Sequence, residues 1–323
     1  MSQIAEKKLG GVQDAATSPI AQIVLDGLSR PQKSLPSFLF YDARGSDLFE
    51  EITRLPEYYP TRTEAAILAE AAPAIAAHTP PGAVLVEYGS GSSRKTEILL
   101  DALPNLAAYA PIDVSQSALA EASARLGRRF PTLRVIPTLG DFSAPLILPA
   151  SLSRRPRTGF FPGSTIGNFA PADAAALLTH MAQGLGDGGR LIIGVDLLKD
   201  VSILIPAYDD AAGVTAAFNL NILARLNREL GADFDLQSFR HEARFYAAES
   251  RIEMHLVSRR RQKIGLLGCL FPLEAGESIH TENSYKYSIA QFQALAELAG
   301  WSCRRVWTDD GDLFSVHELD RGI

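Results

Sequence analysis

Residues 83–102 read AVLVEYGSGSSRKTEILLDA, and this stretch decides the fold class. The apolar run AVLVEY is typical of a buried strand, and residues 94–103 are typical of a helix. Between them, Gly89 and Gly91 let a ligand approach the backbone closely, because glycine has no Cβ. The stretch therefore predicts a strand, a ligand-binding turn and a helix in succession.

The same alternation of strand and helix continues along the chain. Further apolar runs occupy residues 107–115, 133–142, 158–164 and 188–198. Helical segments separate them at residues 94–103, 115–127 and 171–184. Short apolar strands joined by helices predict an α/β fold with a doubly wound parallel sheet that is covered on both faces.

After Leu197 this alternation stops, which indicates a second domain. The pattern predicts helix over residues 207–231, paired strands over 250–258 and 263–271, a helix over 288–299, and a hairpin around Asp309-Asp310-Gly311. We therefore expect a core of residues 62–197 plus 287–323. An inserted α+β substrate-binding domain would comprise residues 15–61 plus 198–286.

The glycine turn suits one cofactor class better than another. Dinucleotides need the pattern GxGxxG, in which the third glycine allows tight packing of the helix. Arg94 occupies that position here and is bulky and charged. S-adenosylmethionine has no pyrophosphate and needs only the shorter GxG. The turn therefore favours S-adenosylmethionine, with Gly89 and Gly91 as cofactor-binding residues.

Polar residues beyond this turn support the same cofactor. Asp113 ends the second strand and can accept both ribose hydroxyl protons. Asp141 follows Gly140 at the end of the third strand and can accept from an adenine amino group, while Phe142 supplies an apolar wall. Lys95, in the first helical turn, can face the methionine carboxylate. Because Gly and Asp are also ordinary turn residues, a doubly wound fold without this cofactor stays open.

Composition and charge argue against several kinds of partner. The 323-residue chain has a net charge of −6 and no long basic run, so we expect no nucleic-acid binding. It has no apolar stretch that could span a bilayer, and MSQIAEKKLGG lacks a signal-peptide core, so we expect no membrane and a cytoplasmic location. Cys269 and Cys303 are interpreted as reduced thiols, and the six histidines lack HxH or HExxH spacing, so we expect no metal. We also expect a monomer.

Four further segments carry a resemblance to a known family: YDARGSDLF (41–49), PEYYPTRTE (56–64), FPGSTIGNF (161–169) and TENS (281–284). With the glycine turn, they cover nearly the whole chain. The chain resembles the histidine Nα-methyltransferases of ergothioneine biosynthesis. The resemblance implies a class I, Rossmann-like methyltransferase core with an inserted substrate-binding domain, S-adenosylmethionine as cofactor and L-histidine as substrate.

The resemblance also implies roles for single residues. Asn168 and Tyr208 would hold the carboxylate and amine region of the substrate. Tyr58 and the backbone near Gly163 would meet the α-amine. Glu282 and Ser284 would bind the imidazole, and substrate identity would rest mostly on these two residues.

The expected chemistry agrees with these residue types. Methyl transfer from a sulfonium to an amine needs an unprotonated amine, so positioning dominates catalysis. A tyrosine hydroxyl or a bound water can accept the proton, and we expect Tyr41 and Tyr58 to be the catalytic residues. Aromatic faces stabilise the quaternary ammonium product, and Tyr41, Tyr58, Tyr59 and Phe218 are available.

Three other functions stay open. A related methyltransferase could act on another amino acid or on an alkaloid amine, although Glu282 and Ser284 favour an imidazole. A nicotinamide-dependent oxidoreductase is disfavoured by Arg94. A non-catalytic module that senses S-adenosylmethionine is disfavoured by the residues that resemble an amine site.

Overall fold

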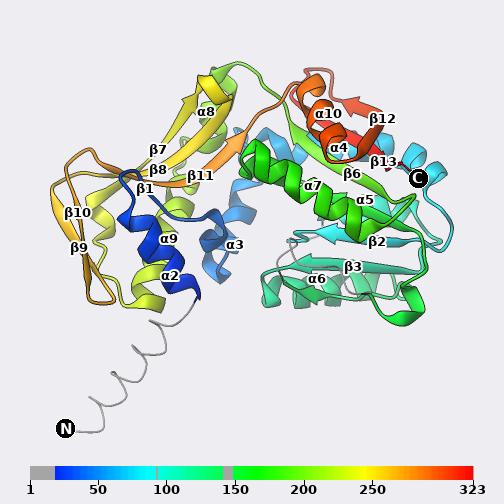
Figure 1. The fold of residues 1–323 in the computed structure, drawn as a ribbon, viewed down its shortest axis with the longest axis horizontal. Coiled ribbons are helices and arrows are strands. Elements are labelled where there is room, and N and C mark those ends of the chain that lie inside the picture. The colour runs from blue at the N-terminus through cyan, green and yellow to red at the C-terminus, as the bar shows by residue number, and fades with distance from the viewer. Residues whose placement is uncertain (1–18, 92–93, 141–147, 323) are drawn as a thin grey trace, which may run out of the picture. The chain divides into compact units, whose positions relative to one another are not determined.

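The computed structural model describes residues 19–91, 94–140 and 148–322. The chain forms two compact units, each built from two segments (Figure 1). Unit 1 comprises Met1–Tyr58 and Asp200–Ser284, and unit 2 comprises Tyr59–Lys199 and Tyr285–Ile323. Neither unit is continuous in sequence.

Unit 2 is an α/β unit with a seven-stranded sheet. Its helices are α4 (Tyr59–His78), α5 (Arg94–Ala102), α6 (Gln116–Arg129), α7 (Pro171–Leu185) and α10 (Ile289–Leu298). Its strands are β2 (Val84–Tyr88), β3 (Ala108–Asp113), β4 (Thr138–Leu139), β5 (Arg157–Phe161), β6 (Arg190–Asp196), β12 (Trp301–Thr308) and β13 (Phe314–Arg321). The strand order is β12-β13-β6-β5-β2-β3-β4, with β2 to β6 parallel and β13 antiparallel to both of its neighbours.

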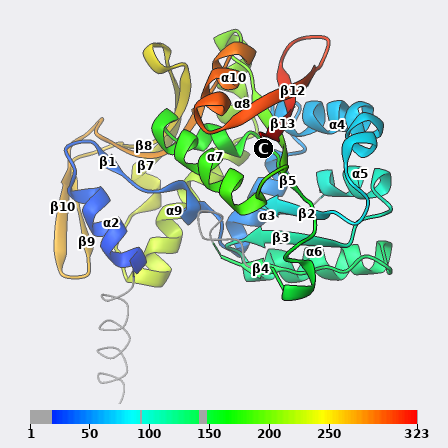
Figure 2. The same cartoon turned by 45° about the vertical axis from the view of Figure 1, so that its right-hand side comes forward.

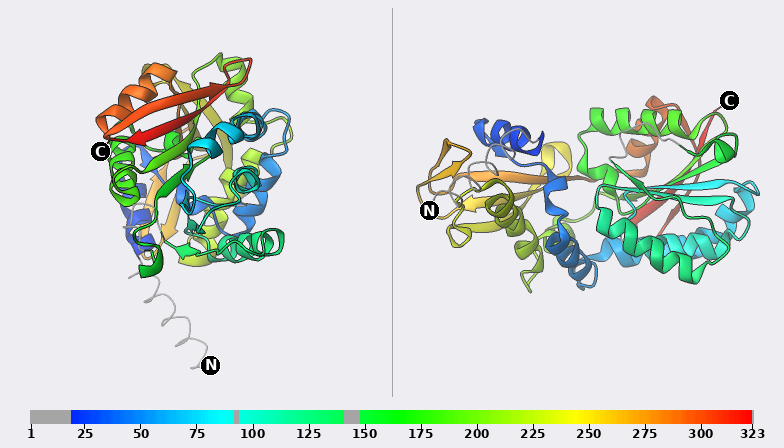
Figure 3. Two further views of the ribbon diagram at one scale, coloured as in Figure 1. Left: turned by 90° about the vertical axis from the view of Figure 1, so that its right-hand side faces the viewer. Right: turned by 90° about the horizontal axis from the view of Figure 1, so that it is seen from below.

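Helices cover both faces of this sheet, because its central strands are apolar on both sides. Val84 and Val86 of β2 join a core that includes residues of α7 and α10, whereas Leu85 joins a core with α4 and α5. Figure 3 shows α6 (teal) and α7 (green) on opposite sides of the strands. The doubly wound α/β fold predicted from the sequence is confirmed.

The third predicted strand is much shorter than residues 133–142. Among its described residues, which end at Gly140, parallel pairing to β3 is limited to Thr138 and Leu139 and to one isolated bridge at Val135. Pro137 lies between them and has no backbone N–H to donate, which interrupts the ladder.

Unit 1 has two small sheets and helices around them. Its helices are α2 (Pro19–Ser29), α3 (Ala43–Ile52), α8 (Val201–Tyr208) and α9 (Val214–Leu230). Short 3₁₀ helices are η1 (Ser37–Phe40), η4 (Leu236–Ser238) and η5 (Ala247–Glu249). The strands are β1 (Lys33–Ser34), β7 (Phe239–Tyr246), β8 (Arg251–Ser258), β9 (Gln262–Leu266), β10 (Cys269–Leu273) and β11 (Ser278–Tyr285), the last residue of which belongs to unit 2.

The strand pairing in unit 1 differs from the sequence prediction. The four-stranded sheet has the order β1-β11-β8-β7, so β8 pairs with β7 and β11 and not with β9. Strand β9 pairs with β10 in a separate hairpin, seen beside α2 and β1 in Figure 2. Leu267 and Gly268 form its two-residue turn, both with positive φ, as the favoured hairpin turn requires.

The helical stretch 207–231 is also divided. Tyr208 ends α8, and the Asp210 carboxylate caps α9 by accepting from the backbone N–H groups of Val214 (3.0 Å) and Thr215 (2.7 Å). Gly213, with φ 74°, precedes the new helix.

Candidate functional site

The glycine turn after β2 has the backbone geometry expected of a ligand loop. Gly89 and Gly91 have φ values of 72° and 44°, a region that favours glycine. The Gly89 N–H donates to the carbonyl of Ile112 at 2.9 Å, which holds the turn against β3. A Cβ built on Gly91 would meet no atom of the described residues within 4 Å, so these residues leave open space above the turn.

Asp113 organises the backbone around this space. One carboxylate oxygen accepts from the Gly91 N–H at 2.8 Å, and the other accepts from the Ser115 N–H at 2.9 Å. A carboxylate offers about four lone pairs, so both oxygens can still accept a ligand hydroxyl. Open space beside an oriented carboxylate fits the adenosyl ribose of S-adenosylmethionine. Asp141 and Phe142 lie outside the described residues.

Glu87 lies directly under the turn and was not singled out from the sequence. It is buried and accepts hydrogen bonds from Tyr109 and from Thr96 at 2.7 Å. Burial raises the pKa of Glu87 to about 8, although these two donors act in the opposite direction. Its only sequence signal was a charge inside the apolar run AVLVEY.

Lys95 is held by a second buried carboxylate, Glu64 of α4. The two side chains form an ion pair, and Glu64 also accepts from the backbone N–H of Gly163 at 2.9 and 3.0 Å. Because that N–H is engaged, the Gly163 carbonyl is the backbone group that suits a substrate amine. The role of Lys95 toward the cofactor stays a prediction.

The segment from Gly163 to Asn168 is fixed within unit 2 at several points. Gly163 has φ 81°, and Ser164 adopts the left-handed conformation at φ 54°. The Ser164 hydroxyl accepts from the Asp196 backbone N–H at 2.8 Å. A Cβ on Gly167 would lie 2.7 Å from the Tyr285 carbonyl oxygen, so only glycine fits there. Asn168 ends the 3₁₀ helix η3 (Thr165–Asn168) and is half-buried.

A buried charge cluster lies at the end of β6. Asp196 accepts from Tyr59 Oη at 2.7 Å and from Lys286 Nζ at 2.6 Å, and Lys199 also donates to it. Burial alone would raise the pKa of Asp196, but Lys286 and Lys199 hold it below its usual range. Burial lowers the pKa of Lys199 to about 8. Tyr59, expected as an aromatic face, is thus part of this cluster.

Aromatic rings gather within unit 1. Tyr41 packs edge-on against Phe49 and Phe218, with ring centroids 5.9 Å apart in both pairs. Phe49 also lies edge-on to Tyr58 at 6.2 Å, and Tyr58 to Tyr208 at 6.5 Å. The structure therefore brings together the two residues expected to be catalytic, and it adds Phe49, which the sequence analysis quoted but did not select.

Tyr208 and Ser284, both expected at the acceptor, touch each other. Tyr208 Oη and Ser284 Oγ are 2.8 Å apart, and both residues are buried. Glu282 precedes Ser284 by two residues on β11, so their side chains lie on the same face of the strand. Glu282 is half-buried.

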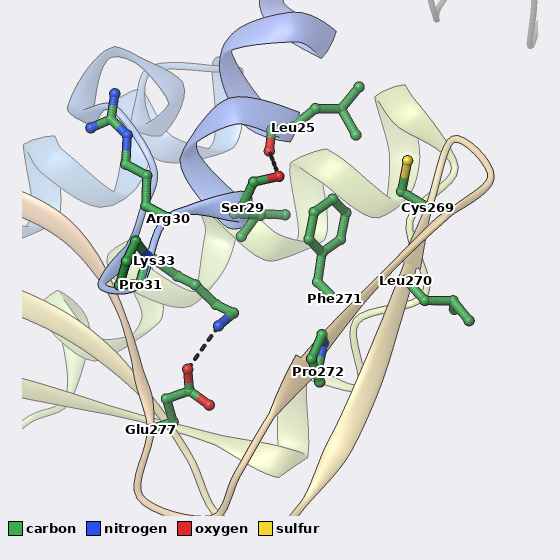
Figure 4. Close-up of a pocket in the computed structure, with 11 residues that line it drawn as sticks. Leu25, Ser29, Arg30, Pro31, Lys33, Cys269, Leu270, Phe271, Pro272 and Glu277 are labelled. Atoms are coloured by element: carbon green, nitrogen blue, oxygen red, sulfur yellow. Dashed lines mark hydrogen bonds and ion pairs between the residues drawn. The ribbon is translucent and has the colours of Figure 1, made fainter.

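Unit 1 has two other features, a hollow and a group of three titratable side chains, one of which (His280) lies 2.9 Å from the Glu282 carbonyl. A hollow of about 690 Å³ opens between α2, β1 and β10, beside the Lys33–Glu277 ion pair at 2.7 Å (Figure 4). None of the expected site residues that the structure describes lines it. Glu253, His255 and His280 also lie close enough to share a metal ion, but Arg251 pairs with Glu253, and a cation in that place disfavours a second one.

Comparison with known proteins shows which family this chain is similar to. The profile of a family described as histidine-specific, S-adenosylmethionine-dependent methyltransferases matches residues 20–321. The histidine N-alpha-methyltransferase of Mycolicibacterium smegmatis is 45% identical over 312 residues, covering 94% of this chain and 95% of the relative. That of Mycobacterium tuberculosis is 43% identical over 317 residues, with the same coverage. Ergothioneine biosynthesis protein 1 of Neurospora crassa is 31% identical over 306 residues, which is 89% of this chain and 33% of the relative.

Across the described residues, no helix has the length and apolar character needed to cross a membrane.

Proposed function

Because the chain belongs to the family of histidine-specific, S-adenosylmethionine-dependent methyltransferases, we propose that it trimethylates the α-amino nitrogen of L-histidine. The product would be hercynine, the trimethylated intermediate of ergothioneine biosynthesis, in keeping with the relative from Neurospora. When bound, S-adenosylmethionine supplies the methyl group on its sulfonium.

Residues of unit 2 would hold this cofactor. The carboxylate of Asp113 receives the ribose hydroxyls, and Gly89 and Gly91 leave room for the ligand against the backbone. Lys95, Asp141 and Phe142 are further proposed cofactor contacts. Asn168 and the Gly163 carbonyl face the amino-acid part of the acceptor in this proposal.

Residues of unit 1 would bind the rest of the acceptor. The observation that carries the assignment is the buried Tyr208–Ser284 contact, since it joins a proposed carboxylate contact to a proposed imidazole contact. Glu282, on the same face of β11 as Ser284, accepts one imidazole N–H. Ser284 pairs with the other ring nitrogen.

The aromatic cluster suits both the reacting amine and its product. The ammonium must lose a proton before its nitrogen has a lone pair. The hydroxyl of Tyr58 or Tyr41 accepts a hydrogen bond from it and relays the proton to solvent water, giving up its own proton as it receives one. The trimethylated nitrogen cannot donate a hydrogen bond, and ring faces stabilise such a cation by about 0.5–2 kcal/mol each. Tyr41, Phe49, Tyr58 and Phe218 form mutually packed rings that can do so.

The experiment that tests this proposal compares kcat/KM for histidine and tryptophan in the wild type and in Glu282→Ala. A site built to hydrogen-bond a side-chain N–H rejects apolar analogues by roughly 10⁴-fold. We expect the substitution to lower kcat/KM for histidine strongly and to leave the affinity for S-adenosylmethionine unchanged. The ratio of kcat/KM for histidine to kcat/KM for tryptophan should become smaller.

A matched control is Glu277→Ala, which removes a carboxylate of the same unit that pairs with Lys33 at the hollow of Figure 4. It should leave histidine turnover intact. If Glu282→Ala behaves like this control, the acceptor is not histidine, and a related amino acid or an alkaloid amine becomes the better candidate.

We also propose a monomer that works in the cytoplasm without nucleic acid, membrane or metal. The acidic composition argues against binding to nucleic acid. The two cysteines, Cys269 and Cys303, form no disulfide, which suits a reducing compartment such as the cytoplasm. Light scattering coupled to size-exclusion chromatography measures the molar mass in solution and so tests the monomeric state.

A further inference from the structure

Three polar side chains behind the proposed acceptor residues, those of Thr281, Asn219 and His241, form a chain of hydrogen bonds in unit 1 that leads to Tyr208, and we call this set of bonds the circuit. Thr281 Oγ1 donates to Asn219 Oδ1 at 2.8 Å, and Asn219 Nδ2 lies 2.8 Å from His241 Nδ1. His241 Nε2 lies 2.7 Å from the carbonyl oxygen of Tyr208. The Tyr208 hydroxyl contacts Ser284 Oγ at 2.8 Å. Ser284 lies on β11, as Thr281 does, three residues further along the strand.

The direction of each bond in this circuit is determined by chemistry. The Tyr208 carbonyl can only accept, so a neutral His241 carries its one ring proton on Nε2 and leaves Nδ1 as an acceptor. The amide nitrogen of Asn219 must therefore point at His241, and in that orientation it also donates to the His255 carbonyl. The amide oxygen then faces Thr281, whose single hydroxyl proton is shared between Asn219 Oδ1 and the Met254 carbonyl.

Burial makes the circuit sensitive to a missing partner. Asn219 is fully buried, and its second N–H donates to the His255 carbonyl at 3.3 Å. Thr281 is 2% exposed, and the side chain of His241 is 1% exposed. A buried polar group without a hydrogen-bond partner is costly, so the loss of one member of the circuit favours rearrangement of its neighbours.

The circuit also anchors Tyr208 at a weak point of the fold. Tyr208 is the last residue of α8, where backbone carbonyls have no partner within the helix. His241 supplies a partner from β7, and Asn219 ties β7 to α9. The main chain of Tyr208 is thus fixed from behind, while its hydroxyl faces Ser284.

We propose that Asn219 and His241 are positioning residues that set the geometry of Tyr208 and Ser284 for acceptor binding. The inference rests on the proposed function, because it gives Tyr208 and Ser284 their roles. Neither Asn219 nor His241 touches the substrate in this account. They act by holding one ring tautomer and one amide orientation.

Protonation of His241 would break the circuit. An added proton on Nδ1 would point at the amide N–H of Asn219. The carboxylates of Asp209, Asp210 and Glu242 face the imidazole and favour its charged form, yet burial outweighs them and lowers the pKa of His241. The circuit is therefore intact at neutral pH and is lost as the pH falls through that lowered pKa.

The first test replaces Asn219 by leucine, which keeps the volume and removes all three hydrogen bonds. We expect KM for histidine to rise about tenfold or more while the dissociation constant of S-adenosylmethionine stays the same. The matched control is Asn227→Leu on the same helix, which removes two bonds to Phe234. It should lower Tm without changing KM. Equal KM values in both variants would overturn the proposal.

The second test keeps the shape of the side chain and replaces the Asn219 amide nitrogen, which donates to His241 and to the His255 carbonyl, by an oxygen that only accepts. The bond to His255, at 3.3 Å the longest of the three, is lost. In Asn219→Asp, the carboxylate accepts from both Thr281 and His241 Nδ1, so His241 becomes an imidazolium that still donates to Tyr208. We expect a raised His241 pKa by ¹⁵N NMR and a histidine KM near that of the wild type. The ratio of wild-type KM to variant KM should increase as pH falls. A constant ratio with an unchanged His241 signal contradicts the assigned tautomer.

Substitutions of the acceptor residues separate this inference from the function it rests on. If Tyr208→Phe and Ser284→Ala leave histidine KM unchanged, the proposed acceptor site is wrong. If they raise KM but Asn219→Leu does not, the site stands and the positioning role fails.

Discussion

At the scale of single residues, Asp113 shows how a ligand contact can be prepared by the backbone. Both of its oxygens already accept main-chain N–H groups, from Gly91 and Ser115. The carboxylate therefore cannot rotate away, and its remaining lone pairs have a fixed direction. Ordered acceptors of this kind lose little entropy when a ligand binds.

Asp113→Ala should weaken S-adenosylmethionine binding by about 1.5–3 kcal/mol, the range for hydrogen bonds to a charged group. Titration calorimetry measures this directly. Asp101→Ala, which removes an exposed carboxylate that pairs with Arg129 on the same sheet's helices, is the control and should not alter binding. An unchanged affinity in Asp113→Ala would remove Asp113 from the cofactor site.

Several important residues could not be identified from the sequence, and they share a cause. Asp196 is 137 residues away in sequence from Tyr59 and 90 residues away from Lys286, and it hydrogen-bonds to both. Glu64 meets the Gly163 N–H across 99 positions. A single sequence shows the residue type at each position but not its partner. Gly89, Gly91 and Asp113 could be proposed as cofactor contacts from the sequence because that proposal depends only on a local strand and turn.

At the scale of elements, β13 carries a buried titratable group into the sheet. His317 has no exposed surface, and its Nε2 lies 2.9 Å from the hydroxyl of Ser315 on the same strand. Burial lowers the pKa of His317 to about 4. The folded protein therefore keeps this ring neutral where an unfolded chain would protonate it.

This predicts acid destabilisation with a defined pH window. Between pH ~6.5 and ~4 the unfolded chain binds a proton at His317 that the folded chain does not bind. The free energy of unfolding therefore decreases as the pH is lowered through this range, by about 3 kcal/mol in total from this group. His317→Gln should remove that part of the slope. Urea unfolding of both proteins at several pH values measures it, and parallel curves for the two would contradict the assignment.

The elements that the sequence predicted poorly are those with polar faces. The helix α7 and the hairpin β12–β13 follow clear apolar patterns and agree with expectation. Strands β7 (FRHEARFY) and β11 (SIHTENSY) have weak apolar alternation, and neither was predicted as a strand. Their inward polar groups are satisfied by partners such as Asn219, which only the tertiary structure supplies. Periodicity arguments fail where buried positions are polar.

At the scale of the whole molecule, the chain passes between the two units three times. The passages lie at Tyr58–Tyr59, Lys199–Asp200 and Ser284–Tyr285. Tyr59, Lys199 and Lys286 each lie within two residues of a passage, and all three donate to Asp196. One buried carboxylate thus binds a residue next to every passage.

Asp196→Ala should be among the most destabilising single substitutions in unit 2. It leaves two lysines buried without their anion, and breaking a buried ion pair costs about 3–5 kcal/mol. The urea midpoint of unfolding measures the effect. Asp200→Ala, which removes an exposed helix cap, is the control and should shift the midpoint much less. Equal shifts would mean that the Asp196 cluster does not stabilise the fold.

Because each unit is built from two segments of the chain, the sheet of unit 2 cannot be completed until its second segment has been translated. Strand β6 has been synthesised once residue 196 is made, yet its antiparallel neighbour β13 spans Phe314–Arg321, far later in the sequence. Throughout translation of the whole inserted segment, that side of β6 has no hydrogen-bonding partner, and open strand edges promote aggregation. A nascent chain that stalls before residue 314 therefore exposes a long apolar edge, which is closed only when β13 has been made.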